Sequence, residues 1–388
     1  MILIKNAKIY TSSEKQNVID NGYILLENNK IKEVATGNYQ GSVERTIDAE
    51  GRNVFPGFVE SHCHLGMTES AIGFEGRDTN EATDPCTPHL RAIDAINPMD
   101  ITFEEARMAG VTTAASGPGS ANVIGGQFCA IKTFGNRIDN MIVKAPLAMK
   151  CAFGENPKRV YDAKKKMPST RMGTAAVLRN ALNKAKQYMA KKEAAGDDCS
   201  KLPAFDMKSE ALIPVLKKEI PLKAHAHRAD DIYTIIRIAK EFDVLATIDH
   251  TTDGSLIVDD LVKAGLPCIV GPSFGHRGKF ELKNKGFATP GILNKAGIKI
   301  AITTDSSVTP LHYLPLMAGL AVKAGLDEME ALKAITIYPA EIIGLADRIG
   351  SIEAGKDADI VIYNGHPFET SGSSWKVFIN GNEVYSAE

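Results

Sequence analysis

The sequence predicts an α/β protein, a (β/α)8 (TIM) barrel joined to a small composite β-sandwich domain that is built from both termini. Two observations carry this prediction. Between residues 55 and 346, apolar runs of strand length alternate with helical stretches, as in a parallel sheet covered by helices on both faces. Outside that segment the chain contains short strands and turns without a helical pattern. We therefore expect residues 55–346 to form the barrel, and residues 1–54 and 347–388 to form the β-domain.

Both ends of the chain consist of short β-rich stretches. The first part, with MILIKNAKIY and GYILLENNKIKEVA, is broken by turns that contain Asn, Gly and Ser. Near the other end, Ala358–Tyr363 and Trp375–Ile379 are strand-like, and the turn Asn380-Gly381 follows them. Neither end has enough apolar length to form a core by itself, so we expect the two sets of strands to pair with each other.

The middle of the chain contains apolar runs with the length and composition of buried strands. These runs are Val54–Ser61, Val111–Ala115, Ile142–Phe153, Leu222–His225, Val244–Ile248, Cys268–Val270 and Ile298–Thr304. The helical stretches between them include Ala229–Phe242, Ser255–Ala264 and Asp327–Thr336. Seven or eight such units in about 290 residues fit a closed barrel better than an open sheet. A doubly wound sheet is the alternative, but Gly117-Pro118-Gly119 lacks the rest of its phosphate-binding pattern.

Two segments interrupt this alternation. Phe74–Asp100 is a long insertion after the first barrel strand, and loops at the carboxyl ends of barrel strands often shape substrate pockets. Ser169–Lys218 is mostly helical and rich in lysine, which indicates outer helices with a solvated basic face.

The composition excludes several classes of protein. Hydrophobic residues make up 44% of the 388 residues, which is typical of a folded globular chain. The 45 Lys and Arg against 47 Asp and Glu give a net charge of −2, so neither nucleic acid nor an anionic membrane surface is an expected partner. The 6 cysteines contain no CxxC pair, and no apolar run is long enough to span a membrane. We therefore expect a reduced, cytoplasmic setting.

The first chemical signal is a pair of histidines at the end of the first barrel strand. In Phe58–His64 (FVESHCH), alternate residues point to the same face of a strand, so His62 and His64 project together. Two neutral imidazoles at the carboxyl end of a barrel strand, where barrel active sites lie, form half of a site for a divalent metal. Glu60 shares this face and is a candidate to orient one of the two histidines.

The same pattern recurs at three later strand ends. His225 and His227 end one strand, His250 ends the next, and Asp305 ends the last. Histidines with purely structural roles have no reason to fall repeatedly on the carboxyl side of strands. The four strand ends together therefore predict a metal site.

These motifs resemble those of the amidohydrolase superfamily of metal-dependent hydrolases, in particular its imidazolonepropionase-like and prolidase-like branch. The resemblance covers nearly the whole chain and includes PGFVESHCH, GVTT, HAHR, IDH, TTDS and the late segment GSIEAGKDADIVI. This set is specific for the superfamily and says little about the substrate. The resemblance implies a barrel with a metal centre, an activity on carbon–nitrogen bonds of a small molecule, and a homo-oligomer.

Carried over to this chain, the resemblance implies five metal ligands: His62, His64, His225, His250 and Asp305. At the fifth strand His225 and His227 share one face, so the residues alone leave the choice between them open. We place the metal on His225, which is nearer the strand body. His227 and Arg228 are then expected to face the substrate, as is His276, which follows the seventh strand.

A two-metal site would need one further ligand, a carboxylated lysine or a glutamate, and two candidates lie close together. Lys150 shares a strand face with Ala148 and Ala152 and would point into the barrel, where a lysine needs a partner or a modification. Glu155, which follows Gly154, would bridge two ions without modification. The choice of bridging ligand stays open, with Lys150 as the first candidate and Glu155 as the alternative. A site with one ion is also compatible with the sequence.

The predicted function is hydrolysis of a carbon–nitrogen bond in a small amide, dipeptide or cyclic amide by a water that one or two divalent ions activate, with zinc as the expected metal. Asp305 would act as general base and then protonate the leaving nitrogen, while the metal, His250 or His227 polarises the carbonyl. Two alternatives remain, a mononuclear deaminase of an amino-heterocycle and a non-catalytic relative used for binding or assembly. Non-catalytic relatives usually have eroded ligands, whereas all five positions are filled here.

Overall fold

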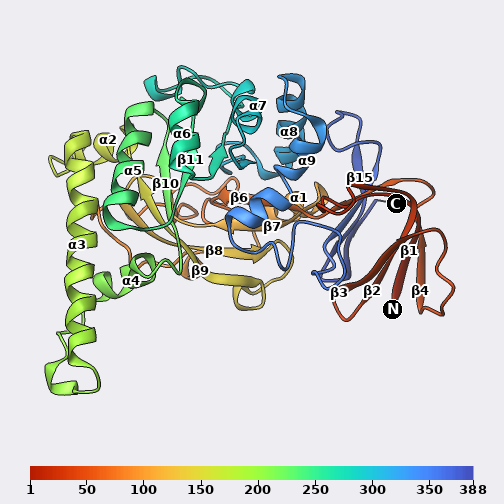
Figure 1. Ribbon diagram of the computed structural model, residues 1–388, viewed down its shortest axis with the longest axis horizontal. Helices are drawn as coiled ribbons and strands as arrows, with labels where there is room; N and C mark the ends of the chain where they lie inside the picture. Colours follow the sequence, from red (N-terminus) through yellow and green to blue (C-terminus); the bar gives the residue numbers. More distant parts are fainter. Residues whose placement is uncertain (388) are drawn as a thin grey trace.

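The computed structural model describes residues 1–387 and has a mixed α/β fold with two separate sheets (Figure 1). Most of the helices lie along one sheet, and the other sheet lies at the opposite end of the molecule from α3 (Arg171–Ala195) and α4 (Met207–Leu216) (Figure 1). The helix-covered sheet has the strand order β13-β12-β11-β10-β9-β8-β7-β6. Its strands are β6 (Phe58–Cys63), β7 (Val111–Ser116), β8 (Ile124–Lys132), β9 (Ile142–Ala152), β10 (Leu222–Ala226), β11 (Ala246–His250), β12 (Cys268–Val270) and β13 (Ile300–Ile302).

This sheet is a nearly closed barrel. Its two outermost strands, β6 and β13, come together where the Thr303 hydroxyl donates to the His62 carbonyl at 2.7 Å. Two residues after His62, the His64 amide donates to the Ser306 carbonyl at 2.6 Å. The barrel expected from the alternation of strands and helices is therefore present, and the open doubly wound sheet is not.

One barrel strand differs from the expected all-parallel arrangement. β8 runs antiparallel to both β7 and β9, while the other neighbouring strands are parallel. Its connections, residues 117–123 and 133–141, are shorter than the dozen or so residues that a parallel crossover needs, so the chain reverses direction twice. The sequence pattern missed this strand because Gly125, Gly126 and Gln127 interrupt its apolar run.

The long insertion covers the side of the barrel at β8, where no crossover helix is available. It contains the short helix η1 (Ala92–Asp94) and forms bridges from Cys86 to Ile124 and from Arg91 to Gln127. Gly126 makes the close approach possible, because a Cβ on it would lie 2.5 Å from the carbonyl oxygen of Leu90. Part of this insertion is therefore a substitute for the missing helix.

The helices lie close to their expected positions. The expected helix over residues 229–242 is α5 (Ala229–Phe242), with Ile232, Ile235 and Ile238 on its buried face. The basic segment 169–218 forms two helices, of which α3 projects from the body of the molecule (Figure 1). The α-helices other than α5 are α1 (Ile101–Met108), α2 (Glu155–Ala163), α3 (Arg171–Ala195), α4 (Met207–Leu216), α6 (Val258–Ala264), α7 (Ala288–Lys295), α8 (Leu314–Lys323), α9 (Glu328–Lys333) and α10 (Ile337–Ile342).

The second sheet combines strands from both ends of the chain. Its order is β16-β15-β14-β5-β1-β2-β3, and β4 also pairs with β1. The two ends meet where β5 pairs antiparallel with β14, with Val54 opposite Ile362. The strands are β1 (Ile2–Tyr10), β2 (Val18–Glu27), β3 (Lys30–Thr36), β4 (Arg45–Asp48), β5 (Asn53–Pro56), β14 (Ile360–Asn364), β15 (Ser373–Ile379) and β16 (Asn382–Ser386).

The division of the chain into two domains stays a prediction. The expected boundaries are residues 55–346 for the barrel unit, and residues 1–54 with 347–388 for a β-sandwich unit, whose last residue lies outside the described part of the chain. Within residues 1–387, no helix is both long and apolar enough to cross a membrane.

A buried ionic cluster links the barrel to the second sheet. Lys132, at the end of β8, is 4% exposed and lies against two carboxylates of the segment that leads into β14. Its ammonium is 3.1 Å from Asp357 and also pairs with Asp359. Asp357 has two other cations beside it, Arg348 at 3.0 Å and Lys30 at 2.6 Å, so Asp359 depends most on Lys132.

Replacing Lys132 with methionine is expected to lower the free energy of unfolding by about 3–5 kcal/mol, because Asp359 stays buried and loses its cation. Urea-induced unfolding followed by circular dichroism measures the change. Lys186, exposed on α3, is the matched control, and Lys186→Met should change the stability by less than about 0.5 kcal/mol. Equal stability of the two variants would contradict the ionic role of Lys132.

Candidate metal centre

The residues predicted as ligands come together at one rim of the barrel. β6, β10 and β11 are parallel members of the barrel, so their carboxyl ends lie at the same rim, as does the segment that follows β13. Two groups of three side chains have ligand atoms within 4.8 Å of one another. One group is His62, His64 and Asp305, and the other is His225, His227 and His250.

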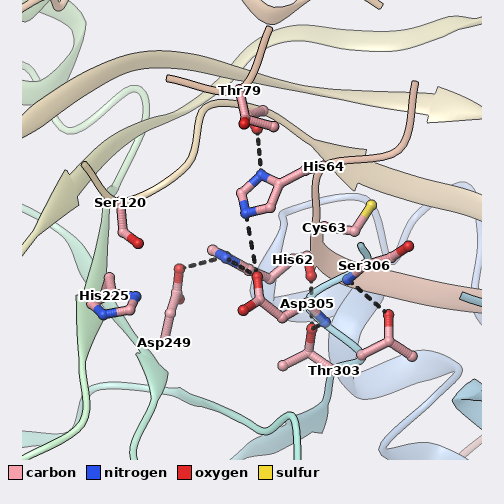
Figure 2. A network of polar contacts seen from close by, with 12 residues as sticks. His62, Cys63, His64, Thr79, Ser120, His225, Asp249, Thr303, Asp305 and Ser306 are labelled. Carbon is pink, nitrogen blue, oxygen red and sulfur yellow. Dashed lines mark hydrogen bonds and ion pairs between the residues drawn. The ribbon is translucent and has the colours of Figure 1, made fainter. Parts of the chain in front are cut away.

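The first group joins the end of β6 to the segment after β13 (Figure 2). Asp305 Oδ1 lies 3.4 Å from His62 Nε2 and 3.3 Å from His64 Nε2. Burial alone raises the pKa of Asp305, but the polar imidazoles beside it, His250 first and then His62 and His64, outweigh this effect and hold the pKa well below its ordinary value. Asp305 is therefore an anion that faces two imidazoles.

The second group consists of three buried imidazoles at the ends of β10 and β11. The ring centroids of His225 and His250 are 4.3 Å apart, those of His225 and His227 are 4.7 Å apart, and those of His227 and His250 are 4.6 Å apart. His250 is the last residue of β11 and has a backbone φ of 77°. His62 connects the two groups, with its ring centroid 5.1 Å from that of His250.

An oxygen atom fixes one ring nitrogen of most of these histidines. The Nδ1 atoms of His64 and His250 lie 2.6 and 2.7 Å from the carbonyl oxygens of Gly117 and Gly271. The Nδ1 of His227 lies 2.7 Å from the Thr252 hydroxyl. When Nδ1 carries the proton toward such an oxygen, Nε2 is left with a free electron pair, which is the arrangement usual for metal-binding histidine.

Asp249 lies against the ring of the fourth histidine, a role that its sequence motif does not indicate. Its carboxylate is fully buried, with Oδ2 2.8 Å from His62 Nδ1 and Oδ1 3.4 Å from the ammonium of Lys223 (Figure 2). Burial raises the pKa of Asp249, but Lys223 and His62 outweigh this effect and lower the pKa far below its ordinary value. A charged pair in two otherwise apolar strands is the signal that could have pointed to Asp249 and Lys223.

The structure separates the two candidates for a bridging ligand. Lys150 is fully buried on β9, with its ammonium nitrogen 3.2 Å from His62 Nε2. Burial lowers the pKa of Lys150 to about 8, although Asp249 and Asp305 oppose this shift. Glu155 instead begins α2, with its carboxylate partly exposed and 4.0 Å from Arg159. Of the two, Lys150 lies at the histidine groups.

The sequence pattern suggested that Glu60 orients a histidine ring, but in the structure Glu60 contacts backbone groups instead. Its carboxylate accepts from the backbone amide of His62 at 2.9 Å and from the amide and hydroxyl of Thr304 at 2.8 and 2.7 Å. Burial raises the pKa of Glu60 to about 7 against these hydrogen bonds. Glu60 therefore joins the backbones of β6 and the segment after β13.

Two residues predicted to face the substrate lie outside the histidine groups. Arg228 precedes α5 and is paired with Asp230 through two hydrogen bonds of 2.9 Å. His276 is exposed, and its carbonyl oxygen accepts from the Lys285 ammonium at 3.1 Å. Contact of Arg228 and His276 with a substrate stays a prediction.

The donors at the rim fit a divalent metal ion. Burial and repulsion by neighbouring groups, His225 first, lower the pKa of His250 well below its ordinary value, so its ring is neutral. Within residues 1–387, the buried Nε2 of His250 has no hydrogen-bond partner. An ion is the partner that suits such an atom, since neutral imidazoles and carboxylates are the ligands that zinc and similar ions prefer. Both groups could hold a metal.

A family comparison supports the same conclusion. The model of the amidohydrolase family matches residues 53–384, which include the barrel and most of β14 to β16. The chain belongs to the amidohydrolase family. This result confirms the resemblance drawn from the sequence motifs, and with it the prediction of a metal-dependent hydrolase that acts on carbon–nitrogen bonds as a class.

Individual amidohydrolases and related proteins show how far this similarity extends. The chain is 43% identical to an amidohydrolase of Thermotoga maritima whose crystal structure covers 100% of both chains with a TM-score of 0.96. It is 29% identical to amidohydrolase tasK of Hapsidospora irregularis over 99% of this chain but only 43% of that protein. The chain thus spans less than half the length of this curated relative.

Other similarities are more limited. A 5-methylthioadenosine/S-adenosylhomocysteine deaminase of Clostridium tetani is 51% identical over 69 residues, which are 17% of this chain and 16% of that protein. Solved structures at 16% identity include a prolidase, with a TM-score of 0.59, and an adenosine deaminase of Xanthomonas campestris, with a TM-score of 0.58. At this identity they show the shared fold alone.

Proposed function

We propose that the protein hydrolyses a carbon–nitrogen bond of a small amide, dipeptide or cyclic amide with the help of one or two divalent ions, zinc being the expected metal. The observation that carries this proposal is the pair of ligand groups that face each other at one barrel rim. Neutral imidazoles and one low-pKa carboxylate in this arrangement suit metal-assisted hydrolysis. We assign the metal ligands as His62, His64, His225, His250 and Asp305.

The residues of this site have distinct roles in the proposed reaction. A divalent ion bound there supplies an acidified water and polarises the substrate carbonyl. Asp305 takes a proton from the attacking water and passes it to the leaving nitrogen. His250 or His227 stabilises the negative charge that develops on the carbonyl oxygen. The Nδ1 partners of the histidines keep their rings in one orientation, so that little reorganisation is needed.

We infer that Lys150 would be the bridging ligand of a two-metal site, after its neutral amine adds carbon dioxide and releases a proton to form a carbamate. Lys150→Met is then expected to reduce the metal content from two ions to one or none per chain, because the bridging oxygens are lost. Glu155→Gln should keep the wild-type content, because that side chain lies against Arg159. Elemental analysis of protein purified without chelator measures both. Loss of an ion in Glu155→Gln, with none in Lys150→Met, would reverse the assignment.

The proposed function is tested by metal content together with a substrate panel. Dipeptides, cyclic amides and amino-heterocycles are offered to the metal-loaded protein, and release of amine or ammonia is followed. Hydrolysis of an amide or dipeptide by protein that holds divalent metal supports the proposal. Protein that binds no divalent metal, and that added zinc or manganese does not activate, would instead support a non-catalytic binding protein.

A deaminase is the second candidate function. The short segment shared with a 5-methylthioadenosine/S-adenosylhomocysteine deaminase favours it, although that segment is 17% of the chain. Such an enzyme would hold one ion and release ammonia from an amino-heterocycle. One ion per chain with ammonia release would therefore favour this candidate over the amide hydrolase.

A further inference from the structure

Glu281 is a buried acid near the histidines for which the motifs of the sequence supply no role. It lies in the short helix η5 (Phe280–Leu282), in the segment between β12 and α7, and it is 2% exposed. One of its carboxylate oxygens is satisfied, since Oε2 accepts from the backbone amide of Glu155 at 2.9 Å. The other, Oε1, is buried and has no hydrogen-bond partner within residues 1–387.

The unpartnered oxygen faces two histidines at equal distances. Oε1 lies 3.9 Å from His225 Nε2 and 3.9 Å from His227 Nε2. Both separations are too long for hydrogen bonds. They are closer to the separation of two ligands on one ion, which is about 3.4 Å for a tetrahedral site with bonds of about 2.1 Å. The arrangement therefore has room for a cation among the three atoms.

The nearest cationic side chain does not satisfy Oε1. The Lys279 ammonium is 3.6 Å away, and it donates instead to Asn156 Oδ1 at 2.6 Å. The Asn156 amide nitrogen in turn lies 3.4 Å from His225 Nε2, a long contact that an ion could replace. A buried carboxylate oxygen without a partner is costly, so an additional cation would stabilise this position.

The backbone of the neighbouring strand end is shaped to receive the Glu281 carboxylate. Gly154 follows β9 with φ of 81°, and a Cβ on it would lie 2.7 Å from Glu281 Oε2. A residue with a side chain at position 154 would therefore displace the carboxylate. The amide of Glu155, at the start of α2, then fixes Oε2 and leaves Oε1 directed at His225 and His227.

We propose that Glu281 is an additional ligand, through Oε1, for the divalent ion held on the His225 and His227 side of the site. This inference rests on the proposed metal-dependent function and adds to its ligand set a carboxylate from the segment after β12. The imidazoles of His225 and His227 are neutral, because burial lowers the pKa of each well below its ordinary value, so the carboxylate contributes a negative charge beside the cation. Binding of the ion also attaches the segment around η5 to the barrel rim.

The first test is a competition titration of metal-free protein with zinc against a chromophoric chelator. Glu281→Gln is expected to weaken the affinity for one ion about 10–100-fold relative to wild type. Glu219→Gln, at an exposed glutamate, is the matched control and should bind zinc like the wild type. Equal affinities of Glu281→Gln and Glu219→Gln would overturn the proposal.

The second test uses the wild-type protein alone, so it does not depend on the folding of a variant. Zinc added to metal-free protein is expected to slow amide hydrogen exchange in residues 279–285, because the ion attaches this segment to His225 at the barrel rim. Zinc binding without slower exchange there would overturn the role of Glu281 and leave the proposed function intact. Wild-type protein that binds no zinc or manganese at all would overturn the proposed function itself.

Discussion

Asp305→Asn is expected to lower kcat about 10²–10⁴-fold while the metal content stays close to that of the wild type, because the variant loses proton transfer and keeps an oxygen ligand. Asp305 Oδ1 lies within 3.4 Å of the Nε2 atoms of both His62 and His64, and the pKa of its carboxyl is held well below the ordinary value. Asparagine has nearly the same shape, but its amide cannot accept the proton of the attacking water.

Steady-state kinetics on a substrate found with the panel, together with elemental analysis, measure this effect. Asp259→Asn, an exposed position at the start of α6, is the matched control and should retain wild-type kcat and metal content. A variant Asp305→Asn with full activity would refute the general-base role. Loss of the metal together with activity would instead make Asp305 primarily a ligand.

Asp249→Asn is expected to have two separate consequences. The Lys223 ammonium, which is 2% exposed, would lose the carboxylate 3.4 Å away, and the free energy of unfolding should fall by about 3–5 kcal/mol. His62 would lose the acceptor that fixes its Nδ1, and the affinity for the ion at His62 should weaken about 10–100-fold. Urea-induced unfolding and zinc competition titration measure the two effects.

The double variant Asp249→Asn/Lys223→Met separates these effects. Replacing Lys223 removes the unpaired buried charge, so most of the lost stability should return. The affinity for zinc should stay low, because Nδ1 of His62 still lacks a carboxylate. If the double variant recovers both properties, Asp249 acts only as a counter-ion of Lys223 and not on the histidine.

Much of the candidate site could be predicted from the sequence because its residues lie at the ends of strands. The alternation of side chains along a strand places His62 and His64 on one face, and the same reasoning places His225 beside His227. The parallel order of these strands then brings their ends to one rim. His250 was predicted in the same way from the end of its strand, whereas the structure was needed to show that the neighbouring Asp249 also reaches the site, at His62.

The site residues that no sequence motif indicates act through partners that are distant in the chain. Asp249 contacts His62 across the barrel, and Glu281 approaches His225 from a segment without regular strand or helix periodicity. Nothing in the neighbouring sequence of Glu281 distinguishes it from a surface glutamate. Its burial depends on Gly154, which leaves room for the carboxylate.

The sequence by itself determined the alternation of strands and helices, the strand ends that carry His62, His64, His225, His250 and Asp305, and the resemblance to the amidohydrolases. These features depend on local periodicity and on motif residues that are close together in the chain. Only the tertiary structure decided the reversed direction of β8, the position of Lys150 rather than Glu155 at the histidines, and the partners of Asp249 and Glu281. The physical reason is that a strand's backbone determines the face on which a side chain lies. Barrel closure and the course of the loops determine which residues that side chain contacts.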